Sequence, residues 1–345
     1  MAQKNLTDFT KHQSIVGQEE SEENKLSPNC KELILSLPRE KGWITPYLYL
    51  FQGFWYAAAE IQAINNFQNH FQAKDSDIIV ASVPKSGTTW LKALIYAIVN
   101  RQYFPSLENH PLLTFNPHEL VPPFEFIIYD DIYNQIHDVS NMAEPRLFGT
   151  HVPFTSLAKS IKETNCKIIY ICRNLFDTFI STWTFVNEIM PQFLPTLPLE
   201  EAFERYCKGI IGFGPSWNHI LDYWKESINR PDKVLFLKYE DLKEDVNFNV
   251  KKMAEFLGCP FTQEEESSGV TENIIKLCSF EKMKELKVNK FGTMGKNRII
   301  ENKYFFRKAE IGDWTNYLSP SLVRELSNII EEKFSASGLS FKAYE

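Results

Sequence analysis

A loop within residues 83–99, VPKSGTTWLKALIYAIV, places a lysine, a glycine and three hydroxyl side chains directly before an apolar helical pattern. The N–H groups and the dipole at the start of a helix bind anions, and a glycine lets the backbone approach a ligand closely. A chance strand, turn and helix with a Ser or Thr N-cap is the alternative. In the common nucleotide-binding loop, G-x-x-x-x-G-K-[ST], the lysine follows the last glycine, whereas Lys85 precedes Gly87. We therefore predict an anion site whose lysine acts from the strand side of the glycine.

Three short apolar runs, each typical of a buried strand, alternate with stretches of helical spacing. This alternation predicts a single α/β domain whose central, P-loop-like parallel sheet has helices on both faces. Ligands of such sheets bind at the carboxyl ends of the strands, where this sequence places Lys85, Arg173 and Tyr239. The expected strands are DIIVASVP (77–84), CKIIYICR (166–173) and KVLFLKYEDL (233–242), and the expected helices cover 90–98, 174–183 and 250–258, the last ending at Gly258.

The overall composition limits the class of protein. The chain has 345 residues and a formal charge of −7, which excludes a whole-chain basic field for nucleic acid. No run approaches the roughly 20 apolar residues of a membrane span, and the acidic N-terminus argues against a transit peptide. The six cysteines form no C-x-x-C pair, so we expect free thiols and a cytoplasmic protein. We predict a disordered acidic tail over 1–28 and one globular domain over 29–345.

Three long stretches lack a clear period. They are expected to be lids or binding loops, with variable surface loops as an equal alternative for the first two. The stretches cover residues 121–145, 187–198 and 288–306.

Five motifs occur together in the order that is found in cytosolic sulfotransferases, and the chain resembles that family from about residue 33 to its end. The motifs are PKSGTTWLKAL (84–94), GTHVPF (149–154), YICRNLFDTFIST (170–182), LKYEDL (237–242) and FFRKAEIGDW (305–314). Three further segments resemble the plant branch, and within it the hydroxyjasmonate sulfotransferases most of all. These segments are LYLFQGFW (48–55), NPHELVP (116–122) and IGFGPSWNHILDYW (211–224).

The resemblance implies an enzyme that transfers a sulfuryl group from 3′-phosphoadenylyl sulfate (PAPS) to a hydroxyl or amine without a metal ion. The products would be a sulfate ester or sulfamate and adenosine 3′,5′-bisphosphate (PAP). We expect a small plant metabolite as the acceptor, with 12-hydroxyjasmonate as the first candidate. A flavonol, a brassinosteroid or another small alcohol stays open, because a few pocket side chains can switch specificity.

The resemblance assigns two residues to the chemical step. His151, in the context T-H-x-P, matches the catalytic base, and histidine suits this role because its pKa lies near the working pH. Lys85 matches the lysine at the 5′-phosphosulfate, where it would stabilise charge that develops on the bridging oxygen. Animal members often carry a lysine two residues before the histidine, whereas this chain has Gly149.

The resemblance also assigns the nucleotide contacts. Arg173 would hold the 3′-phosphate through its bidentate fork, although a structural carboxylate such as Asp177 is an alternative partner. Ala309 stands where the family usually has a glycine, so a positive φ at this residue would be strained. Cys278 is either a further contact or core. The full set of expected contacts is Lys85, Ser86, Gly87, Thr88, Thr89, Trp90 (adenine stacking or core), Arg173, Ser181, Tyr239, Phe280, Arg307, Lys308 and Ala309.

The acceptor pocket and the oligomeric state are less defined by the sequence. The chain has 27 phenylalanines, so core packing competes with a pocket role for each of them. The dimer motif of animal relatives is absent from 315–325, which favours a monomer. The candidate pocket residues are Phe51, Phe54, Phe124, Phe126, Phe154 and Phe185.

Two other classes compete with a sulfotransferase. A P-loop kinase or NTPase would need Mg²⁺, and Glu240 or Asp241 after the third strand could supply the carboxylate. The position of Lys85 argues against it. A protein that only binds an anion would not require both His151 and Lys85.

Overall fold

The centre of the fold is a parallel sheet of four strands in the order β5-β4-β6-β7. In the computed structural model, the described residues are 25–130, 139–191, 194–295 and 299–342. The predicted single α/β domain with a central parallel sheet is confirmed. The strands are β4 (Ile78–Ser82), β5 (Leu147–Thr150), β6 (Lys167–Cys172) and β7 (Val234–Lys238).

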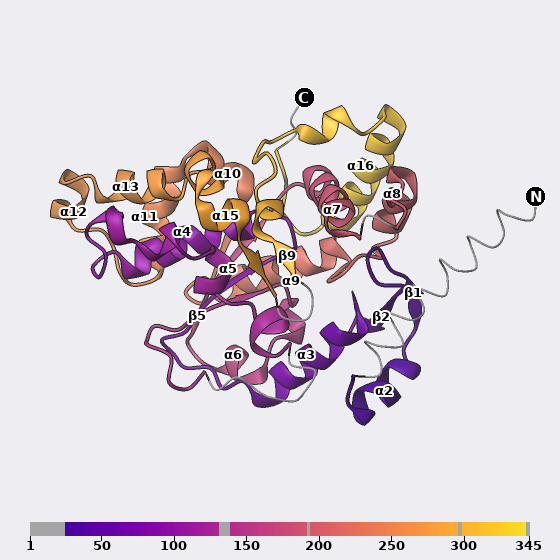
Figure 1. The fold of residues 1–345 in the computed structure, drawn as a ribbon. Coiled ribbons are helices and arrows are strands. Elements are labelled where there is room, and N and C mark those ends of the chain that lie inside the picture. Colours follow the sequence, from indigo (N-terminus) through magenta and orange to yellow (C-terminus); the bar gives the residue numbers. More distant parts are fainter. Residues whose placement is uncertain (1–24, 131–138, 192–193, 296–298, 343–345) are drawn as a thin grey trace, which may run out of the picture.

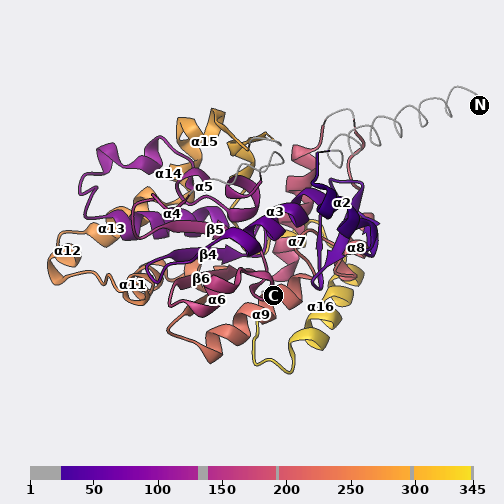
Figure 2. The ribbon, with the colours of Figure 1, turned by 90° about the horizontal axis from the view of Figure 1, so that it is seen from below.

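Both faces of this sheet are buried under helices, because successive side chains of each strand point to opposite faces. In β4, Ile79 and Ala81 belong to one core cluster, whereas Ile78 and Val80 belong to the other. Helices lie on both sides of the sheet in two views (Figures 1 and 2). The first cluster includes residues of α3 (Ala58–His70), α6 (Lys159–Glu163), α7 (Leu175–Ile189) and α9 (Ser216–Asn229), and the second those of α4 (Thr88–Asn100), α11 (Val246–Phe256) and α13 (Val270–Leu277).

The structure corrects the expected elements in two places. Strand β5 was not predicted, because its sequence LFGT is short and contains a glycine, yet all four residues are buried. The expected strand over 233–242 is too long, since the chain turns into α10 (Tyr239–Glu244) directly after Lys238. Gly258 ends the α11 region with a φ of 70°, as expected.

A small antiparallel sheet near the N-terminus supports one wall of the cavity that lies at the carboxyl ends of the parallel strands. It consists of β1 (Arg39–Lys41), β2 (Tyr47–Phe51) and β3 (Phe54–Tyr56). Trp55 exchanges backbone hydrogen bonds with the 213–214 segment, and the Trp43 indole donates to the Ile210 carbonyl at 2.8 Å. These bonds fix the loop that follows α8 (Leu199–Cys207).

Packing at the N-terminus begins slightly before the expected boundary. Leu26 is already buried, and α2 starts at Pro28 (Pro28–Leu35) behind the N-cap Ser27. The predicted tail lies largely outside the described residues, as do parts of the three irregular stretches, 131–138, 192–193 and 296–298. Within the described part of the chain, no helix is long and apolar enough to cross a membrane.

The remaining elements are short, apart from the last helix. The helices are α5 (Pro117–Leu120), α12 (Gln263–Ser267), α14 (Phe280–Glu285), α15 (Lys287–Phe291) and α16 (Pro320–Phe334). The 3₁₀ helices are η1 (Leu107–Asn109), η2 (Pro111–Leu113), η4 (Phe154–Ser156), η5 (Asn302–Phe305) and η6 (Asp313–Asn316), and η3 (Phe124–Ile128) is a π-helix. The short strand β8 (Thr293–Met294) pairs with β9 (Ile300–Glu301).

Candidate active site

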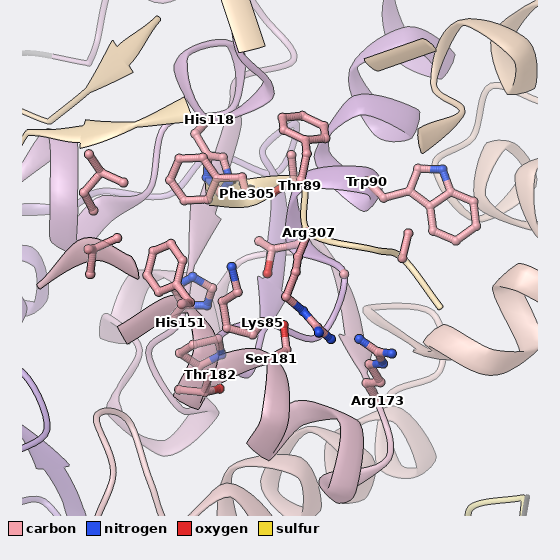
Figure 3. A pocket seen from close by; sticks show the side chains of 18 of the residues that line it. Lys85, Thr89, Trp90, His118, His151, Arg173, Ser181, Thr182, Phe305 and Arg307 are labelled. Carbon is pink, nitrogen blue, oxygen red and sulfur yellow. Dashed lines mark hydrogen bonds between the residues drawn. The ribbon is translucent and has the colours of Figure 1, made fainter. Parts of the chain in front are cut away.

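A cavity of about 990 Å³ lies at the carboxyl ends of the four parallel strands. Lys85, His151, Arg173 and Tyr239 each follow one strand by one to three residues, and all four line this cavity. Figure 3 shows Lys85 and His151 close together, with Arg173 farther along the same wall. Parallel topology thus gathers residues that are far apart in the sequence.

The loop between β4 and α4 has the geometry of an anion cradle. Gly87 has a φ of 101°, and a Cβ at this residue would lie 2.7 Å from the ring of Tyr239. Lys85 itself has a φ of 66°, a left-handed conformation that costs free energy in a non-glycine residue. The buried Ser86 hydroxyl has no hydrogen-bond partner within the described chain. An unpaired buried hydroxyl beside a helix N-terminus fits an absent anion.

The Lys85 ammonium lies among aromatic rings inside the cavity. Its Nζ is 3.8 Å from the ring centroid of Phe185 and 5.8 Å from that of Phe305, and it donates to the Tyr304 carbonyl at 3.4 Å. Burial lowers the pKa of Lys85 to about 7, and nearby Arg307 adds to that effect. A bound anion would reverse this shift, so Lys85 is placed to respond to negative charge.

The ring of His151 is held in the tautomer that a general base needs. Its Nδ1 lies 2.8 Å from the Ser82 carbonyl oxygen, which can only accept, so Nδ1 carries the proton. The lone pair of Nε2 is therefore left for the cavity. Burial lowers the pKa of His151 to about 3, although the Ser82 hydrogen bond opposes this shift. The imidazole is therefore neutral at physiological pH, although its pKa lies below the range near the working pH that was expected of a general base, and an anion bound beside Lys85 would raise it.

A second layer of buried side chains fixes the backbone of His151. The Glu125 carboxylate accepts from the His151 N–H at 2.6 Å and from the Thr150 hydroxyl at 3.0 Å. His219 donates from Nε2 to the His151 carbonyl at 2.8 Å, while its Nδ1 lies 3.0 Å from the Tyr170 hydroxyl. The N–H and the carbonyl of His151 are therefore both held by buried side chains, and this fixes the backbone that carries the ring.

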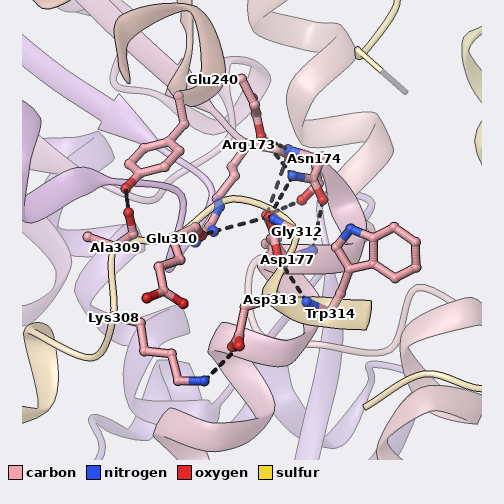
Figure 4. Close-up of polar contacts among 12 residues, drawn as sticks. Arg173, Asn174, Asp177, Glu240, Lys308, Ala309, Glu310, Gly312, Asp313 and Trp314 are labelled. Atoms are coloured by element: carbon pink, nitrogen blue, oxygen red, sulfur yellow. Dashed lines mark hydrogen bonds and ion pairs between the residues drawn. The ribbon is translucent and has the colours of Figure 1, made fainter. Parts of the chain in front are cut away.

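Arg173 pairs with the structural carboxylate that the sequence offered as an alternative partner. One terminal nitrogen lies 3.1 Å from the Asp177 carboxylate, and its guanidinium stacks 4.7 Å from the ring centroid of Tyr239. Its buried Nε nevertheless has no hydrogen-bond partner within the described residues. Asp177 also accepts from the N–H groups of Gly312 and Trp314 (Figure 4). The carboxylate therefore orders the C-terminal segment and leaves Arg173 with capacity for an anion.

The C-terminal basic segment closes over this end of the cavity. Arg307 and Lys308 lie 2.5 and 2.7 Å from the two oxygens of Asp313. Ala309 has a φ of 57°, so the strained conformation expected from the missing glycine is present. Its carbonyl accepts from the Tyr239 hydroxyl at 3.1 Å and from Lys243 (Figure 4).

Aromatic side chains frame the same end. The rings of Trp90 and Tyr239 meet edge to face with centroids 5.7 Å apart, and Trp90 is half-buried at the cavity wall rather than enclosed in the core. Phe280 lines the cavity as well, and Cys278 is buried at its edge. Of the expected nucleotide contacts, the lining contains Lys85, Gly87, Thr88, Thr89, Trp90, Arg173, Ser181, Tyr239, Phe280, Arg307, Lys308 and Ala309, while Ser86 lies just behind it.

The expected phenylalanine pocket is only partly formed. Phe126 and Phe185 line the cavity. Four other candidates lie outside its lining. Phe54, Phe124 and Phe154 are buried in the core, where Phe124 stacks on other aromatic rings, and Phe51 is half-buried on β2. With 27 phenylalanines in the chain, the sequence alone does not distinguish the rings that line the cavity from those in the core.

Four residues were missed by the sequence reasoning. Phe213 flanks His151 with centroids 5.8 Å apart, His118 and Thr182 line the cavity, and Lys92 is buried behind it. His118 and Phe213 belong to the plant-type motifs NPHELVP and IGFGPSWNHILDYW, which marked the branch without assigning a role. Lys92 is the only charged residue of α4, and that contrast was a usable signal.

The carboxylates that a Mg²⁺-dependent enzyme would use have other partners. Glu240 accepts from the N–H and the side-chain amide of Asn174 at 2.9 and 2.8 Å. Asp241 pairs with Lys342 at 3.3 Å. Both contacts engage these carboxylates in the fold, while the buried Oε2 of Glu240 has no hydrogen-bond partner among the described residues.

Comparison with known proteins agrees with this geometry. Residues 75–338 match the model of the sulfotransferase domain. Cytosolic sulfotransferase 15 of Arabidopsis thaliana is 52% identical over 93% of this chain and 89% of its own length. A crystal structure of an Arabidopsis thaliana protein, provisionally described as a steroid sulphotransferase, superposes with a TM-score of 0.72 at 43% identity, covering 90% of this chain and 94% of that one. Mouse sulfotransferase SULT7A1 complexed with PAP gives a TM-score of 0.67 at 26% identity, covering 84% and 95%. The chain therefore belongs to the sulfotransferase family and is a plant-type cytosolic sulfotransferase.

Proposed function

We propose that this protein transfers a sulfuryl group from PAPS to a hydroxyl of a small plant metabolite in the cytoplasm, with 12-hydroxyjasmonate as the first acceptor to test. The observation that carries the proposal is the pairing of a neutral His151, whose Nε2 is left without a partner in the described chain, and a half-buried Lys85 on the same wall. The mouse relative crystallised with PAP supports the choice of nucleotide.

The residues of the chain fit PAPS at both of its anionic groups. Ser86 and the N–H groups at the start of α4 would hold the 5′-phosphosulfate, and Arg173, whose Nε has no partner among the described residues, would hold the 3′-phosphate. Arg307 and Lys308 would join that site from the C-terminal segment. PAPS supplies the sulfuryl group for transfer, and PAP is the other product.

Two side chains would divide the chemical work. His151 accepts the hydroxyl proton of the acceptor at Nε2, which makes the oxygen a stronger nucleophile. Ser82 then stabilises the imidazolium, because its carbonyl keeps the Nδ1 hydrogen bond. Lys85 stabilises the negative charge that develops on the leaving phosphate oxygen. Neither role requires a metal ion.

The acceptor end of the cavity favours a largely apolar molecule. Its described lining comes from residues 43–60, 123–130 and 211–213 and includes Trp43, Leu48, Phe126 and Phe213. Charged groups within that described lining are the carboxylates of Glu60 and Asp130. Among the described residues of this lining, a carboxylate of the acceptor finds no cation, which favours a neutral alcohol such as a brassinosteroid as the second candidate.

Transfer of radiolabelled sulfate from PAPS to a panel of hydroxyl compounds tests this proposal. The panel contains 12-hydroxyjasmonate, its methyl ester, a brassinosteroid and a flavonol, each with and without EDTA. We expect EDTA-insensitive transfer to at least one compound, and the acid and ester report whether a carboxylate is tolerated. Metal-dependent ATP hydrolysis without sulfate transfer would overturn the proposal.

A further inference from the structure

Three polar side chains form a continuous hydrogen-bonded chain behind the anion loop. Lys92 Nζ lies 3.1 Å from Nδ1 of His118, and Nε2 of His118 lies 2.9 Å from Oγ1 of Thr89. Thr89 and Lys92 stand one turn apart on α4, whereas His118 comes from α5. Lys92 is 1% and His118 7% exposed. Figure 3 shows Thr89 and His118 grouped with Phe305 above Lys85 and His151.

The chemistry of the groups fixes the direction of this chain. An ammonium group can only donate, so Nδ1 of His118 accepts from Lys92. Burial lowers the pKa of Lys92 to about 7, and the neighbouring Glu125 carboxylate opposes that shift, so the charged form of Lys92 on which this direction depends is the one that Glu125 stabilises. Burial and Lys92 together hold the pKa of His118 well below its ordinary value, so the imidazole is neutral. Its single proton is therefore on Nε2, and Nε2 donates to the Thr89 hydroxyl oxygen.

A hydroxyl whose oxygen accepts this bond has its own proton free for another partner. Thr89 lines the cavity in the first turn of α4, three positions after Ser86, whose buried hydroxyl has no described partner. We propose that Lys92 and His118 are positioning residues, which orient the Thr89 hydroxyl as a hydrogen-bond donor to the 5′-phosphosulfate. This inference rests on the proposed function, because PAPS is its ligand.

The backbone of β5 makes room for this arrangement. A Cβ at Gly149 would lie 2.4 Å from Nζ and 2.5 Å from Cε of Lys92, whose buried side chain has little space to move. The space that a side chain at residue 149 would occupy is therefore filled by the ammonium group of Lys92 from α4.

His118 and His151 consequently have opposite tautomers within one cavity. His151 carries its proton on Nδ1, since it faces a carbonyl, and presents a lone pair. His118 carries its proton on Nε2, since it faces an ammonium, and presents a donor. His151 is arranged to accept a proton at Nε2, whereas His118 is arranged to donate a hydrogen bond that orients the Thr89 hydroxyl.

Substitutions at both ends of the chain test the proposal through nucleotide affinity. His118→Leu removes the donor, whereas His118→Gln keeps an N–H near the Nε2 position. We expect His118→Leu to weaken PAP binding about tenfold by titration calorimetry and to raise the KM for PAPS without changing the KM for the acceptor. His118→Gln should restore affinity to within about twofold. Lys92→Met should give an intermediate loss, because the tautomer is then no longer fixed.

The same substitutions in a Thr89→Val background isolate the mechanism. If His118 acts through the Thr89 hydroxyl, His118→Leu adds no further loss of PAP affinity there. Additive losses, or equal losses from Gln and Leu at 118, would overturn the inference. A wild-type chain that fails to bind PAP would instead overturn the proposed function.

A matched control separates this effect from damage to the fold. His110 is also buried, but it lies outside the cavity lining and accepts from the Leu112 N–H at 3.2 Å. His110→Asn should leave PAP affinity unchanged. If His118→Leu lowers the melting temperature much more than this control, the Lys92→Met variant carries the test.

Discussion

The two ends of the cavity are built from different parts of the fold. The end that we propose for the nucleotide is polar and basic, and Lys85, Arg173 and Tyr239 there follow strands of the parallel sheet by one to three residues. The acceptor end is lined mainly by aromatic and aliphatic side chains from the N-terminal sheet, η3 and the 210–214 loop. His151 lies between them, with Phe126 and Phe213 on its acceptor side at ring distances of 6.1 and 5.8 Å.

The two ends of the cavity therefore place their side chains in different ways. Residues at strand ends are placed by sheet topology, so a charged group there is fixed relative to the others. Rings from loops are placed by long-range packing, such as the hydrogen bonds that tie Trp43 and Trp55 to residues 210–214. The nucleotide end should therefore respond to substitution through charge, and the acceptor end through shape.

Lys85→Met should have the largest effect of the substitutions that distinguish the two ends. It removes the cation at the leaving oxygen, so we expect kcat to fall about 10²- to 10³-fold. The acceptor KM should change little. Steady-state kinetics with saturating PAPS measure both values, and a kcat within twofold of wild type would contradict the assigned role.

Arg173→Met should reduce PAP affinity by about 10- to 100-fold, as expected for a lost hydrogen bond to a charged group. Calorimetry with PAP measures this loss. Arg230→Met is the control, because Arg230 pairs with Glu226 on α9 away from the cavity lining. Equal affinities of the two variants would remove Arg173 from the nucleotide site.

Phe213→Ala should act on the acceptor end alone. Loss of a ring beside His151 is expected to raise the acceptor KM roughly tenfold while the KM for PAPS stays constant. The ratio of the two KM changes is the quantity to measure. A larger change in the PAPS KM would break the division between the two ends.

The smallest expected effect concerns stability, at a histidine outside both ends. Burial lowers the pKa of His110 to about 4. The unfolded chain therefore binds a proton near pH 6.5 that the folded chain does not, so stability is lost as the pH falls below 6.5. Between pH 7 and pH 5 this residue contributes about 2 kcal/mol of that loss.

Denaturant unfolding of wild type and His110→Asn at both pH values checks the sign and size. The variant should lose less stability than wild type over this interval. Identical losses would show that burial at this site does not perturb the histidine, and would weaken the same argument for His151.

The sequence predicted three of the four strands of the parallel sheet and most of the residues that line the proposed nucleotide end. Apolar runs ending in Lys85, Arg173 and Tyr239 were visible, and parallel topology then required their convergence. The strand before His151 was missed, because LFGT has no apolar run long enough to be recognised. His151 itself was found only through the family resemblance.

Buried contacts between distant segments were beyond the reach of the sequence. Lys92 and His118 are 26 positions apart, and no local period joins them. The inward-facing rings could not be separated from core rings for the same reason, so Phe54 and Phe154 were expected in a pocket that they do not line.

The central claim is that His151 takes the acceptor proton while the nucleotide end holds PAPS independently. Measuring kcat and PAP affinity together for His151→Ala tests it most directly. We predict that kcat falls by about 10³-fold or more while the Kd for PAP stays within about twofold. A variant that retains wild-type kcat, or that loses PAP binding together with activity, would contradict the account.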